Sequence, residues 1–134
     1  MSNLLTSHCL PRQALGADCE REMFALFDAH FVGATPASFR RDLDNKNWVI
    51  LLHDQANILQ GFSTLALYSS EHAGQPISVV CSGDTIVRPE YWGTPELPRS
   101  WIRSVLTLSQ DMPHPLYWLL ISSGYKTYRF LSVF

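Results

Sequence analysis

The stretch "CSGDTIVRPEYWGTPELPRSW", residues 81–101, contains the change of local structure that decides the fold. Its first part completes a run over 77–87 that is rich in β-branched residues and typical of a strand. A loop with proline and glycine follows, and from Leu97 onward apolar residues recur at helical spacing. The sequence therefore predicts a strand, a loop and a helix in direct succession, and the loop is a candidate ligand site.

Two helices are predicted ahead of this stretch. Apolar residues at three-to-four spacing predict an amphipathic helix over 17–32, which Gly33 would end. The pair Thr35–Pro36 predicts the start of a second helix that runs to about Asp44, because threonine caps helices and proline fits the first helical position. Residues 1–16 show no period, so they form either an irregular lead-in or a short edge element.

Strands are predicted on both sides of the quoted stretch. The runs 47–54 and 58–70 are separated by three residues, which predicts a hairpin, and Gly61 indicates a bulge or a close backbone approach. The helix after the loop stops before Pro113. The apolar run 116–122 is typical of a strand covered on both faces, as strands of parallel sheets are.

The order of these elements predicts an α/β (α+β) fold with a mixed sheet. Three strands in hairpin-like succession form an antiparallel meander, and the crossover helix joins the third of them to a parallel neighbour. Helices flank this mainly antiparallel sheet. The length of 134 residues and the hydrophobic content of 46% fit a single domain over 1–134.

Composition narrows the partners and the compartment. A net charge of −2 without a run of Lys or Arg argues against nucleic acid as a partner. No apolar stretch approaches the roughly 18 residues of a membrane span, and no leader-like segment opens the sequence, so we expect no membrane partner and a cytoplasmic location. Cys9, Cys19 and Cys81 have no paired spacing and are predicted to be reduced and buried.

This order of elements, with the segments "WVILL", "LQGFSTLALY" and "DTIVRPEYWGTPELPRSWIRSVL", resembles the GCN5-related N-acetyltransferase (GNAT) superfamily over roughly residues 24–128. The resemblance implies transfer of an acetyl or other acyl group from acetyl-CoA or another acyl-CoA to an amine by direct attack, on a small molecule or a peptide. In that family the fourth strand ends in a loop of pattern Gln/Arg-x-x-Gly-x-Gly/Ala, which binds the cofactor's pyrophosphate with backbone N–H groups and a helix start.

The loop matches this pattern only in part. One register puts Trp92, Pro95 and Leu97 at the three motif positions, and a shift by two matches Gly93. Backbone N–H groups near the strand end would hold the thioester carbonyl, while arginines, a hydroxyl, a glycine and the first helical N–H groups would hold phosphate. These candidate cofactor contacts are Thr85, Ile86, Val87, Arg88, Trp92, Gly93, Thr94, Glu96, Leu97 and Arg99. The alternative is a loop that only connects strand and helix.

Two residues are catalytic candidates by the same resemblance. Asp84 lies within a strand-like run, facing either solvent at an edge or a cleft, and would deprotonate the amine. Tyr128 is nearest to the family's tyrosine that protonates the departing thiolate; the alternative is a packed ring. His53 is predicted to be a turn residue. No histidines have metal-ligand spacing, so no metal is assigned.

Two other functions remain open. Pro95 and the missing glycines favour a non-catalytic GNAT-like interaction or regulatory domain that has lost cofactor binding, and an unrelated mixed-sheet binding domain is a third reading. The segment "YRFLSVF" at 128–134 is still apolar where the family fold continues. It predicts a homo-oligomer, or a fragment whose missing C-terminal part completes the site; the alternative is a segment that folds back on its own domain.

Overall fold

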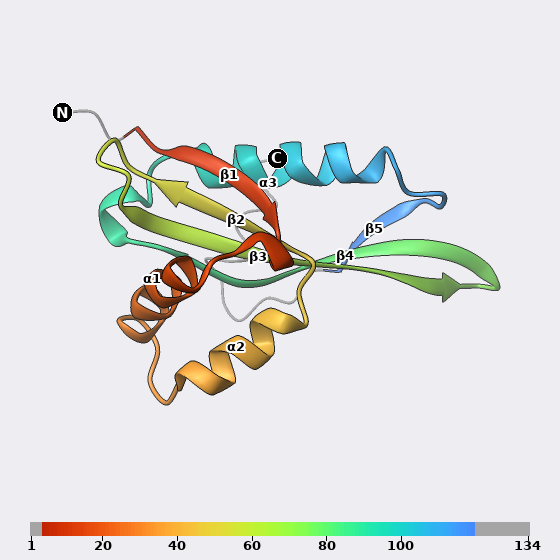
Figure 1. Cartoon of the computed structure of the whole chain (residues 1–134). Helices are drawn as coiled ribbons and strands as arrows, with labels where there is room; N and C mark the ends of the chain where they lie inside the picture. Colours follow the sequence, from red (N-terminus) through yellow and green to blue (C-terminus); the bar gives the residue numbers. More distant parts are fainter. Residues whose placement is uncertain (1–3, 120–134) are drawn as a thin grey trace.

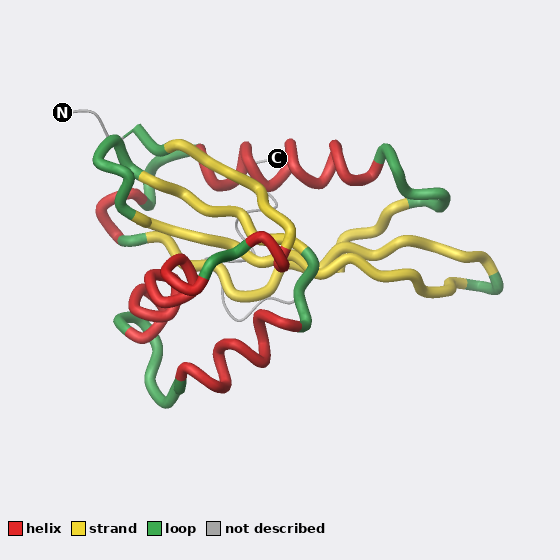
Figure 2. The backbone as a smooth tube through the Cα atoms, viewed as in Figure 1, coloured by secondary structure: helices red, strands yellow, loops and turns green. Residues whose placement is uncertain are grey.

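The structure, a computed structural model, describes residues 4–119. Over this range one five-stranded sheet has the order β1-β2-β3-β4-β5, with helices on both of its faces (Figures 1 and 2). The first four strands are antiparallel, and β5 is parallel to β4. The strands are β1 (Thr6–Pro11), β2 (Trp48–His53), β3 (Leu59–His72), β4 (Gln75–Val87) and β5 (Leu116–Leu119). The predicted mixed, mainly antiparallel α/β sheet is confirmed.

Within the described residues, three α-helices flank the sheet. α1 (Ala17–Asp28) and α2 (Pro36–Asp44) lie on one face, and α3 (Glu96–Ser109) lies on the other (Figure 1). Short 3-10 helices, η1 (Arg12–Ala14) and η2 (Pro89–Tyr91), follow β1 and β4. The start of α2 is as predicted, because the Ser38 N–H donates to the Thr35 hydroxyl at 3.1 Å.

Two hydrophobic cores hold these layers together. Residues alternate along β2, so that Val49 and Leu51 face α1 and α2 while Ile50 and Leu52 face α3. The first core is formed by Leu15, Met23, Leu26, Phe39, Leu43, Val49, Leu51, Leu59, Phe62 and Ile86. The second is formed by Leu5, Ile50, Leu52, Leu65, Val80, Leu97, Trp101 and Val105. Burying one such aliphatic or aromatic side chain contributes about 1.5–3 kcal/mol to the free energy of folding, so the two cores stabilise the packing of helices on both faces of the sheet.

The first helix is shorter than the sequence pattern predicts. It ends at Asp28 rather than at Val32, which is fully exposed. The aromatic spacing that extends the pattern is real, because the rings of Phe27 and Phe31 stack with centroids 4.7 Å apart. That contact joins the last turn of α1 to the residues that follow it, and Gly33 then reverses the chain at a φ of 90°.

The two outer strands differ from expectation in opposite ways. Of the two alternatives for the N-terminal residues, the edge element is confirmed, since β1 pairs along its length with β2. The parallel pairing of β5 is also confirmed, but its covering on both faces is wrong over 116–119. Tyr117 and Leu119 are 52% and 46% exposed, because α1 and α2, the helices on their face of the sheet, do not extend over β5 (Figure 1).

Gly61 shows both features that the sequence indicates. The pairing of β2 with β3 shifts register beside it, which is a bulge. A side chain there would put its Cβ 2.8 Å from the carbonyl oxygen of Ile86 and 3.1 Å from a methyl group of Val87. The glycine therefore lets β3 approach the end of β4, which leads into the loop of interest.

Candidate functional site

A β-bulge interrupts β4 at Gly83 and Asp84. The register between β3 and β4 shifts between Ser63 and Leu65. Two residues of β4 therefore oppose the single residue Thr64 of β3. The Cβ direction of Gly83 faces the side chains of Lys46 and Thr64, and the Asp84 carboxylate interacts with Asp42 of α2 and with Lys46, so both bulge residues meet the end of α2.

The side chain of Lys46 lies across this bulge. A Cβ at position 83 would clash with Lys46 Cε and Thr64 Oγ1, and it would lie 3.3 Å from Lys46 Nζ. Lys46 follows α2, where its N–H donates to the carbonyl of Leu43 at 3.0 Å, so the end of the helix sets its position. Glycine at 83 is what leaves room for the lysine side chain.

Asp84 is a half-buried carboxylate beside that lysine. Burial raises its pKa above the usual value and the charge of Asp42 raises it further, while the charge of Lys46 opposes both. β5 pairs with β4 at residues 78–81, so within residues 4–119 Asp84 lies where β4 is paired on the β3 side alone, and a carboxylate that faces a cleft stays a prediction. A carboxylate whose pKa is raised toward neutrality is better suited to accept a proton.

The backbone beyond the bulge presents two amides on the side away from β3. The Arg88 N–H donates to the Gln60 carbonyl of β3 at 2.9 Å. Because backbone groups alternate along an antiparallel strand, Ile86 also points its N–H at β3, while Thr85 and Val87 point theirs to the opposite side. Of the three predicted carbonyl contacts, geometry therefore favours Thr85 and Val87 over Ile86.

The indole of Trp92 returns to the same strand end. Its Nε1–H donates to the Val87 carbonyl at 2.6 Å, which confirms that this carbonyl points away from β3. The ring itself is 59% exposed. Trp92 thus lies at the mouth of the loop, as expected for a residue that could line a ligand site.

Several hydrogen-bond donors of the loop donate to acceptors within the loop itself. The N–H groups of Tyr91, Trp92 and Thr94 donate to loop carbonyls at 2.9, 3.2 and 3.1 Å, respectively. The Thr94 hydroxyl donates to the Tyr91 carbonyl at 2.9 Å, so it stabilises the turn in this structure. Gly93 has no atom within 4 Å of the place where a Cβ would be, so the chain there is open to close approach.

The start of α3 keeps two donors. The first intrahelical bond runs from the Arg99 N–H to the Pro95 carbonyl at 3.1 Å, and Pro98 has no N–H. The N–H groups of Glu96 and Leu97 therefore precede the helical ladder, where an anion is favoured. The Glu96 carboxylate accepts a hydrogen bond from Ser7 Oγ at 3.2 Å, which holds this negative charge toward β1.

The strand end suggests a motif register that the sequence reading did not use. Arg88 is the first residue after β4, and it is half-buried. Counting the pattern from there puts Arg88 and Gly93 at its first and last positions and Tyr91 in place of the first glycine. The register that begins at Trp92 fits less well because it starts five residues after Val87, the last residue of the strand. Arg99 lies on the exposed side of α3.

Several other predicted residues have a different setting. His53 is the last residue of β2, as the predicted strand over 47–54 requires, and it precedes the turn rather than lying in it; its ring lies 6.0 Å from that of His8. The three cysteines are free but only half-buried, which corrects the expected full burial. Tyr128 and the segment 128–134 lie outside the described residues.

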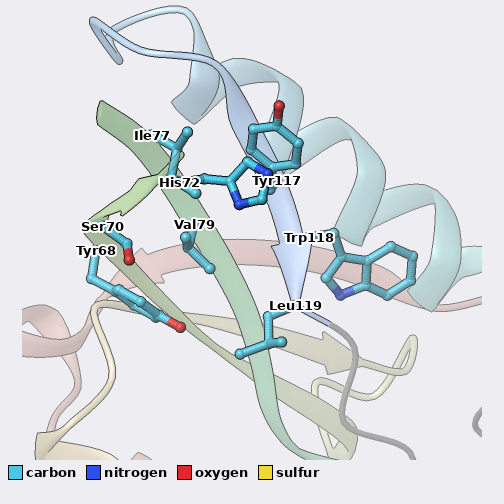
Figure 3. A pocket seen from close by; sticks show the side chains of 8 residues that line it. All are labelled: Tyr68, Ser70, His72, Ile77, Val79, Tyr117, Trp118 and Leu119. Atoms are coloured by element: carbon cyan, nitrogen blue, oxygen red, sulfur yellow. The ribbon is translucent and has the colours of Figure 1, made fainter. Parts of the chain in front are cut away.

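A shallow groove lies over β3, β4 and β5, on the sheet face to which Val79, Tyr117 and Leu119 belong (Figure 3). It has a volume of about 340 Å³ and was not foreseen from the sequence. Its lining comes from three strands: Tyr68, Ser70, His72, Ile77, Val79, Tyr117, Trp118 and Leu119. In Figure 3 the Trp118 indole points to the other side, toward α3, where its ring centroid lies 4.6 Å from that of Trp101.

Residues 4–119 contain no group of three side chains that could together ligate a metal ion. None of the helices in this range combines the length and the apolar character needed to cross a membrane.

Comparison with known proteins gives structural neighbours only. No protein-family model matches the sequence, and no curated protein sequence matches it significantly. An aminoglycoside 6'-N-acetyltransferase from Acinetobacter baumannii matches with a TM-score of 0.68 at 8% identity, over 96% of this chain and 88% of the other. An aminoglycoside acetyltransferase from an uncultured soil metagenomic sample, solved with sisomicin, matches with a TM-score of 0.65 at 13% identity, over 98% and 87%.

A third neighbour widens the comparison beyond these enzymes. A probable N-acyltransferase from Enterococcus faecalis matches with a TM-score of 0.67 at 16% identity, over 92% of this chain and 31% of the other. At such identities the likeness establishes a fold and leaves the activity open.

Proposed function

We propose that this chain, which has the fold of the GNAT acetyltransferases, is an acyl-CoA-dependent N-acyltransferase. The acyl donor would be acetyl-CoA or another acyl-CoA, and the acceptor a small-molecule or peptide amine. The neighbours solved as aminoglycoside acetyltransferases make polyamines and amino sugars the first acceptors to try. We also propose that the protein is cytoplasmic and consists of a single domain.

The bulge in β4 is the observation that carries this proposal. It sets the half-buried carboxylate of Asp84 next to backbone N–H groups of Thr85 and Val87 that point away from β3. An amide-forming enzyme needs a group that removes a proton from the amine and donors that stabilise the oxygen of the attacked carbonyl. Both kinds of group occur here within a few residues of one strand.

The roles of the other residues follow from their positions. Arg88, the open backbone at Gly93 and the N–H groups of Glu96 and Leu97 would bind the phosphates of the donor. Asp84 would accept the proton of the attacking amine, directly or through a water molecule. Tyr128 would protonate the leaving thiolate, a role that rests on the family resemblance alone.

The proposal is tested by thiol release from acetyl-CoA in the presence of sisomicin, spermidine and a lysine-containing peptide. We expect acceptor-dependent release, and Asp84→Asn should lower kcat by roughly 100-fold with little change in acetyl-CoA binding, because it removes a base and no phosphate contact. Asp28→Asn, an exposed change on α1, is the matched control and should leave the rate unchanged. An unaltered rate in Asp84→Asn would remove this residue from the mechanism.

A non-catalytic GNAT-like interaction or regulatory domain is the second candidate. Its support is the start of α3, where two prolines lack N–H groups and the carboxylate of Glu96 competes with any bound phosphate. Glu96→Gln discriminates between the two, because it removes a repelling charge and keeps the side-chain length. Acetyl-CoA binding that stays undetectable at millimolar ligand in both the wild type and this variant would favour the non-catalytic reading.

A further inference from the structure

We propose that the ε-amine of Lys46 is itself an acyl acceptor, so that the chain acylates the lysine that lies over its own β4 bulge. This inference rests on the proposed acyl-CoA-dependent function. It goes beyond that function because it names a modification site on the protein.

Position is the first argument. Lys46 Nζ lies 3.3 Å from the place that a Cβ of residue 83 would take, directly over the bulge. Its backbone is held at the end of α2 by the bond to Leu43, and Asn47 beside it accepts a hydrogen bond from the Leu67 N–H at 2.6 Å. The lysine is therefore anchored at both ends of its backbone while its side chain crosses the sheet.

Reach is the second argument. Thr85, whose amide points away from β3, lies two residues beyond Gly83, which is about 7 Å along a strand. A lysine side chain has four rotatable carbon–carbon bonds and can sweep this distance from a fixed backbone. The amine can therefore approach a thioester whose carbonyl oxygen is held by the N–H groups of Thr85 and Val87.

The surroundings of the amine are the third argument. The charges of Asp42 and Lys46 both act on the Asp84 carboxylate across this bulge. Asp84 is therefore the proton acceptor that lies beside the amine. Lysine is the side chain whose amine, once deprotonated, is a good nucleophile toward acyl groups.

The reaction balances without another reactant. The Lys46 ammonium gives a proton to the Asp84 carboxylate, and its nitrogen attacks the thioester carbonyl. The tetrahedral adduct loses coenzyme A as thiolate, so that a C–N bond forms and a C–S bond breaks. A proton from the nitrogen completes the free thiol, and the product is an uncharged amide on Lys46.

The sequence provides an internal control, because the only other lysine of the chain is Lys126. The full chain is incubated with acetyl-CoA, and acetyl groups at each lysine are counted over time by mass spectrometry of peptides. The same chain unfolded in urea gives the ratio expected from unassisted chemistry. We expect the folded chain to label Lys46 at least tenfold faster than Lys126, and the unfolded chain to label the two at similar rates.

Two variants and one parallel titration make the outcome decisive. Asp84→Asn should slow labelling of Lys46 on the order of 100-fold and leave Lys126 unchanged, while Lys46→Arg should leave only the slow labelling of Lys126 and keep the charge at position 46. Calorimetric titration of coenzyme A into the same Lys46→Arg protein reports donor binding separately. Binding without preferential labelling of Lys46 overturns this inference alone, whereas absent binding overturns the proposed function and the inference with it.

Discussion

Gly83→Ala tests the packing of the bulge, on which the whole site depends. The added methyl group would overlap Lys46 Cε and Thr64 Oγ1. The lysine can swing away, but the threonine is part of β3 and its hydroxyl donates to the Asp84 carbonyl at 3.5 Å. We therefore expect the strands to shift, and the lysine to leave the bulge.

The cost follows from the size of the overlap. Inserting a methyl group into a tightly packed position lowers the free energy of unfolding by about 1–3 kcal/mol. For a chain of this length each kcal/mol corresponds to roughly 3–5 °C in Tm, so we expect a fall of about 3–15 °C. Lys46→Ala in the same background should restore part of this loss, since it removes one of the two overlapping groups.

Thermal and urea unfolding followed by circular dichroism measure the effect. Gly93→Ala is the control, because no atom lies within 4 Å of its added methyl group and its backbone is not left-handed. It should unfold within about 0.5 kcal/mol of the wild type. Equal stability of Gly83→Ala and the wild type, or equal losses in the two variants, would refute the argument that glycine at 83 is required by Lys46 and Thr64.

Three further outcomes are expected. Burial raises the pKa of Asp84, so the folded state disfavours its ionised form and loses stability as pH rises through that pKa. Asp84→Asn should therefore raise Tm at pH 7. The gain in Tm, measured by calorimetry, should disappear below about pH 4, where the carboxyl group is protonated in both the folded and the unfolded chain. Hydrogen bonds from the Ile58 N–H, the Gln60 side chain and the Ala56 N–H lower the pKa of Asp54. The contribution of Asp54 to the stability of the fold is therefore present at neutral pH and is lost as pH falls through its pKa in the folded chain. Asp54→Ala should lower Tm at pH 7 and make no difference to Tm near pH 2. The exposed apolar face around Tyr117 predicts self-association, which light scattering at micromolar concentration would show and which a clean monomer would contradict.

Much of the fold is predictable because its determinants are local. The change from a period of two to a period near 3.6 after Val87 marks the strand and the crossover helix, and the Thr35–Pro36 pair marks the start of α2. β1 is ambiguous from its sequence because its pairing with β2 is a contact between distant parts of the chain. The exposure of β5 is likewise set by which helices cover the sheet, and an apolar run alone does not reveal it.

The candidate site likewise has a part that the sequence predicts and a part that it does not. Asp84 is recognisable from the sequence because a charge within a strand is unusual. The bulge beside it is not, since it depends on register against β3, and Lys46 reaches it from an element almost forty residues earlier in the chain. The motif register could have been found by fixing the strand end at Val87 and counting from Arg88.

Calorimetric titration of acetyl-CoA into the purified chain tests the central claim most directly. The account predicts saturable binding of one acetyl-CoA per chain, weakened at least tenfold by Arg88→Ala and unaffected by the exposed change Arg103→Ala on the outer side of α3. Absence of heat at millimolar acetyl-CoA, or equal weakening by both arginine variants, would contradict it.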